Sequence, residues 1–213
     1  MRHWGSPLHT LLEATDKAKV DTNLLMHLNN DLTNIARTFE ALRSDQIDTA
    51  VNALVSAERV WVLGLRSSYS MAHYARFLLT LLKPDVRLIP AGGLSFAEEV
   101  VNMEAGDVLL AIGFRRRPRI LQDLLKRAHG AGVMIIFVTD LSASLTTRHA
   151  DIVLRCHHRG AHFTDSYTAA MSVLNYLTSA VAYRLGDAVR ERVDGIDELH
   201  DALDAFTVMP KPQ

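Results

Sequence analysis

Apolar residues near the start of the chain recur with the spacing of amphipathic helices. Between residues 22 and 42 they follow one another at steps of three and four, which predicts one long helix. Its apolar stripe consists of Leu24, Leu25, Leu28, Leu32, Ile35, Phe39 and Leu42. A second helix is expected over 46–57, after the capping pair Ser44-Asp45. It leads directly into 59–64, a β-branched and aromatic run closed by glycine, which indicates a buried strand.

Beyond residue 64, predicted helices alternate with short apolar runs. Helices are expected over 68–82, 94–103, 118–129, 165–185 and 189–205, and further strands over 86–89, 108–112, 133–138 and 152–154. The strands are continuous runs of Val, Ile and Leu, which indicates that helices cover both of their faces. Strands separated by helical crossovers form a parallel sheet. We therefore predict an α/β fold, a three-layer α/β/α sandwich with a five-stranded parallel sheet, preceded by a helical N-terminal segment.

Length and composition fit a single domain with short flanking segments. The chain has 213 residues, of which 48% are hydrophobic and 22% charged, within the range of globular proteins. We expect a linker-like segment over 1–20, one domain over 21–206 and a tail over 207–213. The single cysteine, Cys156, excludes an intramolecular disulfide, and no apolar run is long enough to span a membrane. These features favour a cytoplasmic protein with no membrane partner.

The charge balance argues against nucleic acid as a partner. The formal net charge is −1 and the sequence pI is about 6.8. Residues 1–58 carry five basic and eight acidic side chains, whereas a DNA-reading segment would be basic. We therefore expect no DNA binding by this chain alone, and any phosphate must be bound by a local site.

Two predicted loops at carboxyl ends of strands have the chemistry of an anion site. The loop over 64–70 places Arg66, Ser67 and Ser68 at the start of a helix, although either serine could serve only as a helix cap. The loop over 113–119 gathers four arginines, and guanidinium groups suit phosphate and carboxylate contacts. They are Arg115, Arg116, Arg117 and Arg119. The alternatives for this loop are a solvated run or a subunit interface.

Two later segments carry weaker signals. Thr139 and Ser144 could contact ligand hydroxyl groups, whereas a cap role is the simpler explanation for Asp140 or Ser142. The segment over 156–165 gathers one thiol and three imidazoles, which are zinc ligand types, but their spacing is not typical of a zinc site. We therefore expect no metal and no cofactor, and assign the histidines to a ligand pocket or a subunit interface.

In this order and spacing, the loops resemble those of the sugar isomerase (SIS) domain, and within it the ligand-sensing half of RpiR-type transcription regulators. The similarity covers about residues 24–205. Such regulators begin with a helix-turn-helix domain, which we expect this chain to lack because residues 1–58 are too few and too acidic for it. The stretches that carry it are 57–64 before Arg66-Ser67-Ser68, 106–108 leading to 112–116, and Thr139-Asp140 followed by Ser144 and Ala150-Asp151. The resemblance implies a phosphosugar bound at the carboxyl edge of the sheet, in a dimer whose helices complete the site.

The sequence departs from the family pattern at two places. Three hydroxyl positions of the second loop are here Gly113, Arg115 and Pro118, so that arginine would replace hydroxyls as the phosphate partner. The stretch 160–162 lacks the catalytic glutamate of aminosugar isomerases, although His162 could move a proton in its place.

From this combination we predict a non-catalytic phosphosugar sensor. Ser67, Ser68 and Arg66 or Arg115 would hold the phosphate, and Glu98 or His162 would contact sugar hydroxyls. The alternatives are an aldose–ketose isomerase with His162, His158 or Glu98 as base, and an interaction protein that has lost its ligand.

We also expect a homodimer or a dimer of dimers, because the helices carry more apolar surface than one sheet can cover. The stripes in question are that of the first helix and a second one made of Leu174, Leu177, Val181 and Leu185.

Overall fold

The fold is known from a computed structural model, which describes residues 24–93, 95–161 and 163–203. In chain order the elements are α2 (Leu24–Ala41), α3 (Ser44–Ser56), β1 (Val60–Gly64), α4 (Ser68–Thr80), β2 (Val86–Ile89), α5 (Phe96–Val100), β3 (Val108–Gly113), α6 (Arg119–Gly130), β4 (Met134–Asp140), the short 3-10 helix η1 (Thr146–His149), β5 (Ile152–Cys156), α7 (Thr168–Leu185) and α8 (Asp187–Ala202). Each predicted strand and helix is present. The largest difference is α5, which is five residues long where the sequence predicts ten.

The five strands form one parallel sheet in the order β2-β1-β3-β4-β5. The central strands β1 and β3 are buried at every position, as their unbroken apolar runs predict. Among the residues that the structure describes, β2 lies at one edge of the sheet and pairs with β1 alone. The carboxyl ends of all five strands therefore meet at one edge, where the loops that carry the candidate residues emerge.

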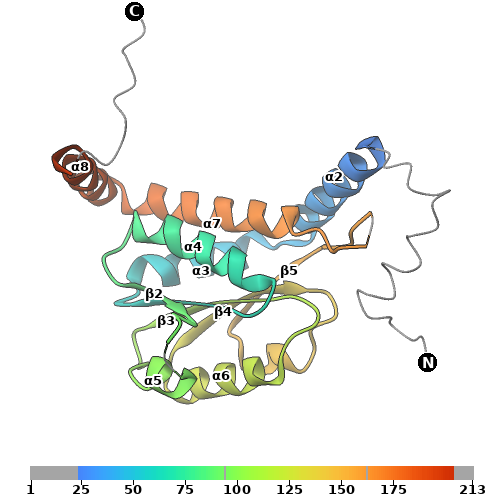
Figure 1. The fold of residues 1–213 in the computed structure, drawn as a ribbon, viewed down its shortest axis with the longest axis horizontal. Helices are drawn as coiled ribbons and strands as arrows, with labels where there is room; N and C mark the ends of the chain where they lie inside the picture. The colour runs from blue at the N-terminus through green and yellow to red at the C-terminus, as the bar shows by residue number, and fades with distance from the viewer. Residues whose placement is uncertain (1–23, 94, 162, 204–213) are drawn as a thin grey trace, which may run out of the picture.

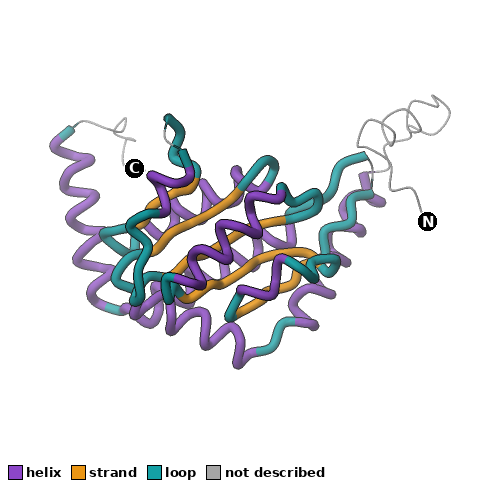
Figure 2. Tube along the Cα trace, turned by 90° about the horizontal axis from the view of Figure 1, so that it is seen from below, coloured by secondary structure: helices purple, strands orange, loops and turns teal. Residues whose placement is uncertain are grey.

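Helices cover both faces of the sheet, so the predicted three-layer sandwich is confirmed (Figure 1). Helices α3, α4 and α7 lie on one face, and α5 and α6 on the other. Figure 2, seen from below, shows the strands side by side with helices in front of them and behind. One core fills each space between layers: Leu54, Met71 and Leu177 belong to the first, and Leu125 and Phe137 to the second.

Helix α2 turns its polar side to the rest of the molecule. Its buried residues are Asn34 and Thr38, while Leu24, at 78% exposure, Leu28 and Leu32 face outward. Asn34 donates a hydrogen bond to the carbonyl of Arg159 at 2.8 Å, and Thr38 accepts one from the backbone N–H of the residue after β5 at 2.9 Å. The predicted helix is thus confirmed, but most of its apolar stripe faces away from this chain's core, and Leu42, just after the helix, is the stripe residue that packs against it. The loop after β5 needs hydrogen-bond partners, and the polar side of α2 supplies them.

The expectation of a second surface stripe on the closing helices is wrong. Leu174, Leu177 and Val181 of α7 are fully buried in the core against the sheet, and Leu185 packs at its border. A long apolar helix face can be covered by its own sheet as well as by a second subunit, and periodicity does not distinguish the two. The predicted linker over 1–20 and the predicted tail over 207–213 fall outside the described residues.

Candidate functional site

The loop after β1 has a constrained backbone. Arg66 has a φ of 56°, in the left-handed region that only a few per cent of non-glycine residues adopt. The turn is closed by hydrogen bonds from the backbone N–H of Ser68 to the carbonyl of Leu65 and from that of Tyr69 to the carbonyl of Arg66, at 3.1 and 3.0 Å. Such conformations persist where surrounding structure holds them and cluster at functional sites. The Arg66 side chain is exposed at this edge.

The two serines of this loop have different roles. The hydroxyl of Ser67 lies 3.0 Å from that of Tyr167, and its side chain makes no cap hydrogen bond to α4. Ser68 is 2% exposed, and its Oγ accepts a hydrogen bond from the backbone N–H of Phe114 at 3.2 Å. Ser68 therefore ties the loop after β1 to the loop after β3, while Ser67 stays at the surface.

Aromatic rings join these loops to the start of α7. Phe114 is buried, and its ring centroid lies 5.6 Å from that of His158 and 5.3 Å from that of Tyr167. Burial raises the pKa of the Tyr167 hydroxyl, so this group stays protonated at neutral pH and can donate a hydrogen bond. His158 and Tyr167 thus lie against Phe114, and Ser67, next to Arg66 in the loop after β1, contacts Tyr167. The sequence points to Arg66, Ser67 and His158, whereas Tyr167 lies in a stretch with no distinguishing pattern and is found only in the structure.

The arginine loop is organised by a buried carboxylate. Asp140, at the end of β4, is inaccessible to solvent and accepts hydrogen bonds from the backbone N–H of Arg115 at 3.0 Å and from that of Ser142 at 2.7 Å. It also forms an ion pair with Arg117 and accepts the hydroxyl of Ser142 at 2.5 Å. Arg117 in turn donates to Ser142 Oγ at 3.0 Å. Arg117 therefore neutralises an acid of this chain.

The surroundings of Asp140 keep it ionised. Burial alone would raise its pKa, but the hydrogen bonds from Ser142 and the charge of Arg117 more than compensate and hold the pKa below its usual value. The Asp140 carboxylate thus takes up two hydrogen-bond donors, the amide of Arg115 and the guanidinium of Arg117, which could otherwise bind an external anion. The arginines of this loop other than Arg117 are Arg115, which is half-buried, and Arg116 and Arg119, which are exposed.

The remaining candidates are dispersed. Thr139 is buried, and its hydroxyl donates to the carbonyl of Gly113 at 2.6 Å, which fixes β4 against β3. Ser144 is exposed, and the Thr147 hydroxyl donates to its carbonyl at 2.9 Å. Glu98 caps its own helix through the N–H of Ser95 at 2.5 Å and lines a separate cavity beside β2. His162 lies outside the described residues.

A histidine and a carboxylate meet just before α7. His158 Nε2 lies 4.0 Å from Asp165 Oδ2, and the Asp165 side chain is 43% exposed. Within residues 24–93, 95–161 and 163–203, no three histidine, cysteine or acidic side chains are grouped so that they could hold a metal ion. No helix in the same residues is long and apolar enough to cross a membrane.

Comparisons with known proteins agree on one family. The family model of the SIS domain matches residues 53–180, more than half of the chain. The sugar isomerase domain of an RpiR transcription factor from Sphaerobacter thermophilus superposes with a TM-score of 0.78 at 25% identity, over 84% of this chain and 99% of that one. The Vibrio vulnificus NanR protein, complexed with ManNAc-6P, superposes with a TM-score of 0.73 at 13% identity, over 92% of this chain and 75% of that one.

One curated relative is an enzyme. The glutamine–fructose-6-phosphate aminotransferase (isomerizing) of Pyrobaculum aerophilum is 27% identical over 164 residues, which are 74% of this chain and 26% of that protein. The chain thus spans about a quarter of the length of this relative. The matched residues contain the whole sheet and the loops of the candidate site, and the chain belongs to the SIS domain family.

Proposed function

We propose that this chain is a non-catalytic sensor domain that binds a phosphosugar at the carboxyl edge of its sheet, as part of a cytoplasmic transcription regulator of the RpiR type. The observation that carries the proposal is the cluster around Phe114. There the hydroxyls of Ser67 and Tyr167 and the imidazole of His158 are held together beside the strained Arg66. Hydroxyls suit sugar contacts, and the guanidinium suits phosphate.

The similar proteins support this ligand class. The NanR structure holds ManNAc-6P, and the Sphaerobacter domain belongs to an RpiR transcription factor. In this chain the phosphate would be held by Arg66, Ser67 and the side chain of Arg115, with Ser68 fixing the two loops in register. The backbone N–H of Arg115 already donates a hydrogen bond to Asp140. We therefore assign phosphate recognition to the side chains of Arg66, Ser67 and Arg115 and not to this amide.

Titration calorimetry tests the proposal with ManNAc-6P as ligand and with ManNAc and inorganic phosphate as controls. We expect the phosphosugar to bind more tightly than either part. Arg66→Gln should weaken binding by roughly tenfold or more, as loss of a charge-assisted contact does, and Ser67→Ala by less. Arg127→Gln, at an exposed position on α6, is the matched control. Equal affinities of Arg66→Gln and Arg127→Gln would contradict the proposed site.

The pair of His158 and Asp165 favours one alternative, a sugar-phosphate aldose–ketose isomerase. A carboxylate beside an imidazole can orient it as a general base, which proton transfer between two sugar carbons requires. The test is incubation with fructose 6-phosphate in deuterated water. A sensor incorporates no label at the carbon next to the carbonyl. Label that disappears in His158→Ala would establish the isomerase.

We further propose that the chain forms a homodimer or a dimer of dimers through the outward face of α2. The exposed apolar residues of that face include Leu28 at 49% and Leu32 at 54%. Burying such a stripe stabilises an assembly through the hydrophobic effect. Light scattering at micromolar concentration should give at least twice the mass of one chain, and Leu28→Glu with Leu32→Glu should shift the mass to that of a monomer. A monomeric wild-type protein would refute this assembly.

A further inference from the structure

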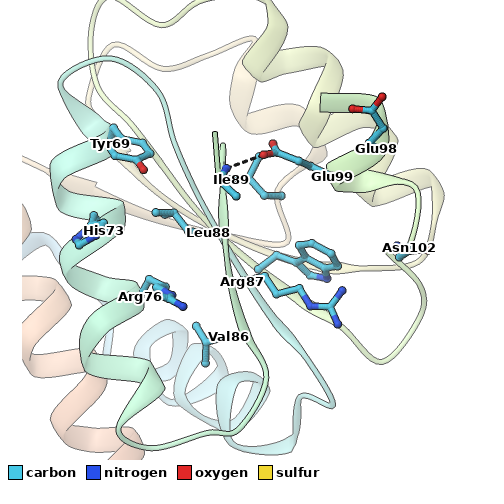
Figure 3. Close-up of a pocket in the computed structure, with 12 residues that line it drawn as sticks. Tyr69, His73, Arg76, Val86, Arg87, Leu88, Ile89, Glu98, Glu99 and Asn102 are labelled. Atoms are coloured by element: carbon cyan, nitrogen blue, oxygen red, sulfur yellow. Dashed lines mark hydrogen bonds between the residues drawn. The ribbon is translucent and has the colours of Figure 1, made fainter. Parts of the chain in front are cut away.

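A cavity lies beside β2, at the edge of the sheet. It has a volume of about 560 Å³, within the range of small-molecule sites. It extends around β2, so side chains from both faces of the sheet line it (Figure 3). The lining residues are Trp61, Tyr69, His73, Arg76, Val86, Arg87, Leu88, Ile89, Ala91, Glu98, Glu99 and Asn102. Helix α4 supplies one wall and α5 the other, and none of the groups around Phe114 takes part.

The α5 wall is acidic. Glu99 is only 7% exposed, and its side chain extends from α5 toward the end of β2 (Figure 3). Its Oε1 accepts a hydrogen bond from the backbone N–H of Ala91 at 2.6 Å, whereas Oε2 is buried with no hydrogen-bond partner among the described residues. A buried carboxylate oxygen without a donor is costly, so a donor supplied by a ligand would relieve a deficit built into the fold. Glu98 adds a second carboxylate to this wall.

The α4 wall is basic. Arg76 and His73 lie one turn apart on α4 and line the cavity from the side opposite to Glu99 (Figure 3). Within residues 24–93, 95–161 and 163–203 neither forms an ion pair with an acid. The third cation, Arg87, is already engaged, because it pairs with Asp85 at 2.8 Å. The cavity thus presents an uncompensated carboxylate on one side and an uncompensated guanidinium on the other.

An extended peptide fits this edge less well than a small molecule. Strand β2 has four residues, carries the exposed Arg87 and is followed by Pro90, features that protect a sheet edge from strand addition. The cavity extends around the free edge of β2: Val86 and Leu88 lie on the α4 side of the strand, and Ile89 and the ring of Trp61 on the α5 side, so apolar groups accompany each charged wall. This arrangement matches a molecule with a charge of each sign separated by an apolar body.

We propose that the cavity beside β2 binds a small zwitterion of amino-acid size, whose ammonium group donates to Glu99 and whose carboxylate is received by Arg76 and His73. The methylene or side-chain carbons of the ligand cross the free edge of β2, between Leu88 on the α4 side and Ile89 on the α5 side. This binding site is separate from the phosphosugar site and rests on none of its residues. Occupancy would stabilise the native chain, since the ligand binds that state and not the unfolded one.

The test uses a series of ω-amino acids that vary the distance between the two charges: glycine, β-alanine, 4-aminobutanoate, 5-aminopentanoate and 6-aminohexanoate. Binding is measured by ligand-observed NMR and titration calorimetry on the full chain. We expect an optimum at one chain length, with at least tenfold tighter binding than butylamine or butanoate, each of which carries one charge only. A capped peptide, N-acetyl-trivaline amide, serves as the probe for strand addition.

Variants assign the contacts. Glu99→Gln keeps an acceptor for the Ala91 amide but loses the charge, and Arg76→Gln loses the cation; each should weaken the best ligand at least tenfold. Arg127→Gln on α6 should bind like wild type, and so should Ser67→Ala, which separates this result from that for the phosphosugar site. Circular dichroism checks that each variant is folded. If Glu99→Gln does not fold, the affinity of Arg76→Gln, a change at an exposed position, tests the proposed site.

Three outcomes would overturn the inference. The first is a folded wild-type protein that binds no member of the series better than the singly charged compounds. The second is unchanged affinity in Arg76→Gln. The third is tighter binding of the capped peptide than of any zwitterion, which would make the edge of β2 a site of strand addition.

Discussion

Replacing Asp140 by Asn should destabilise the protein by about 3–5 kcal/mol, the cost of removing one partner from a buried ion pair. The carboxylate is fully buried and accepts hydrogen bonds from the backbone N–H groups of Arg115 and Ser142 and from the Ser142 hydroxyl. It also forms an ion pair with Arg117. Asn keeps one acceptor oxygen, which can stay with Ser142. Its amide NH2 would then face the N–H of Arg115 and the guanidinium of Arg117, so donors would oppose donors.

A double-mutant cycle measures the pair itself. Arg117→Met leaves Asp140 with its other hydrogen bonds, so we expect a smaller loss of about 1–3 kcal/mol. The double variant Asp140→Asn/Arg117→Met should lose at least about 1 kcal/mol less than the sum of the two single losses, because the two groups interact directly. Urea unfolding at pH 7, followed by circular dichroism, gives each free energy. Arg127→Met, on the surface of α6, is the control and should stay within about 0.5 kcal/mol of wild type.

The pH dependence gives an independent check. The pKa of Asp140 in the folded protein is below the ordinary value of 3.8, so its stabilising contribution is complete above that value. It is lost as the pH falls through the lower folded pKa. The difference in unfolding free energy between wild type and Asp140→Asn should therefore be constant from pH 7 to about pH 5 and shrink below about pH 4. A difference under about 1 kcal/mol at pH 7, or one that grows in acid, would refute this reasoning.

Three further predictions concern the core. Gly64→Ala should lower the free energy of unfolding by several kcal/mol, because the new Cβ would lie 2.5 Å from a backbone oxygen of α4. Gly195→Ala, in open space on α8, should be neutral or raise it by up to about 1 kcal/mol. Urea unfolding measures both variants. Cys156 is fully buried, and burial together with a nearby negative charge raises its pKa to about 12, so iodoacetamide should modify it only under unfolding conditions, and rapid native labelling would contradict its burial. Trp61→Phe removes the 2.8 Å hydrogen bond from the indole to the buried carboxylate of Asp107 and should destabilise by about 1–3 kcal/mol; a melting temperature equal to that of wild type would count against it.

The pattern of apolar residues was sufficient to determine the architecture. Strands such as β3 (Val108–Gly113) are apolar at every position, and only a sheet covered on both faces buries such a run. The helical spacers between the strands then required parallel pairing. The predicted ends of the helices were less accurate than their positions, as α5 shows. The turn that ends a short helix depends on local contacts, which hydrophobic periodicity does not encode.

The tertiary structure alone decided which polar groups meet. Four arginines in one loop indicated an anion site, but the sequence could not show that Arg117 would pair with Asp140, twenty-three residues away. Nor could it show that the Ser68 hydroxyl would accept a hydrogen bond from the backbone N–H of Phe114, or that Glu98 would lie beside β2. Hydrophobic periodicity is a local property, repeated every two or three to four residues, and is therefore readable along the chain. Pairing of charges across a sheet depends on strand order and register, which exist only once the chain has folded.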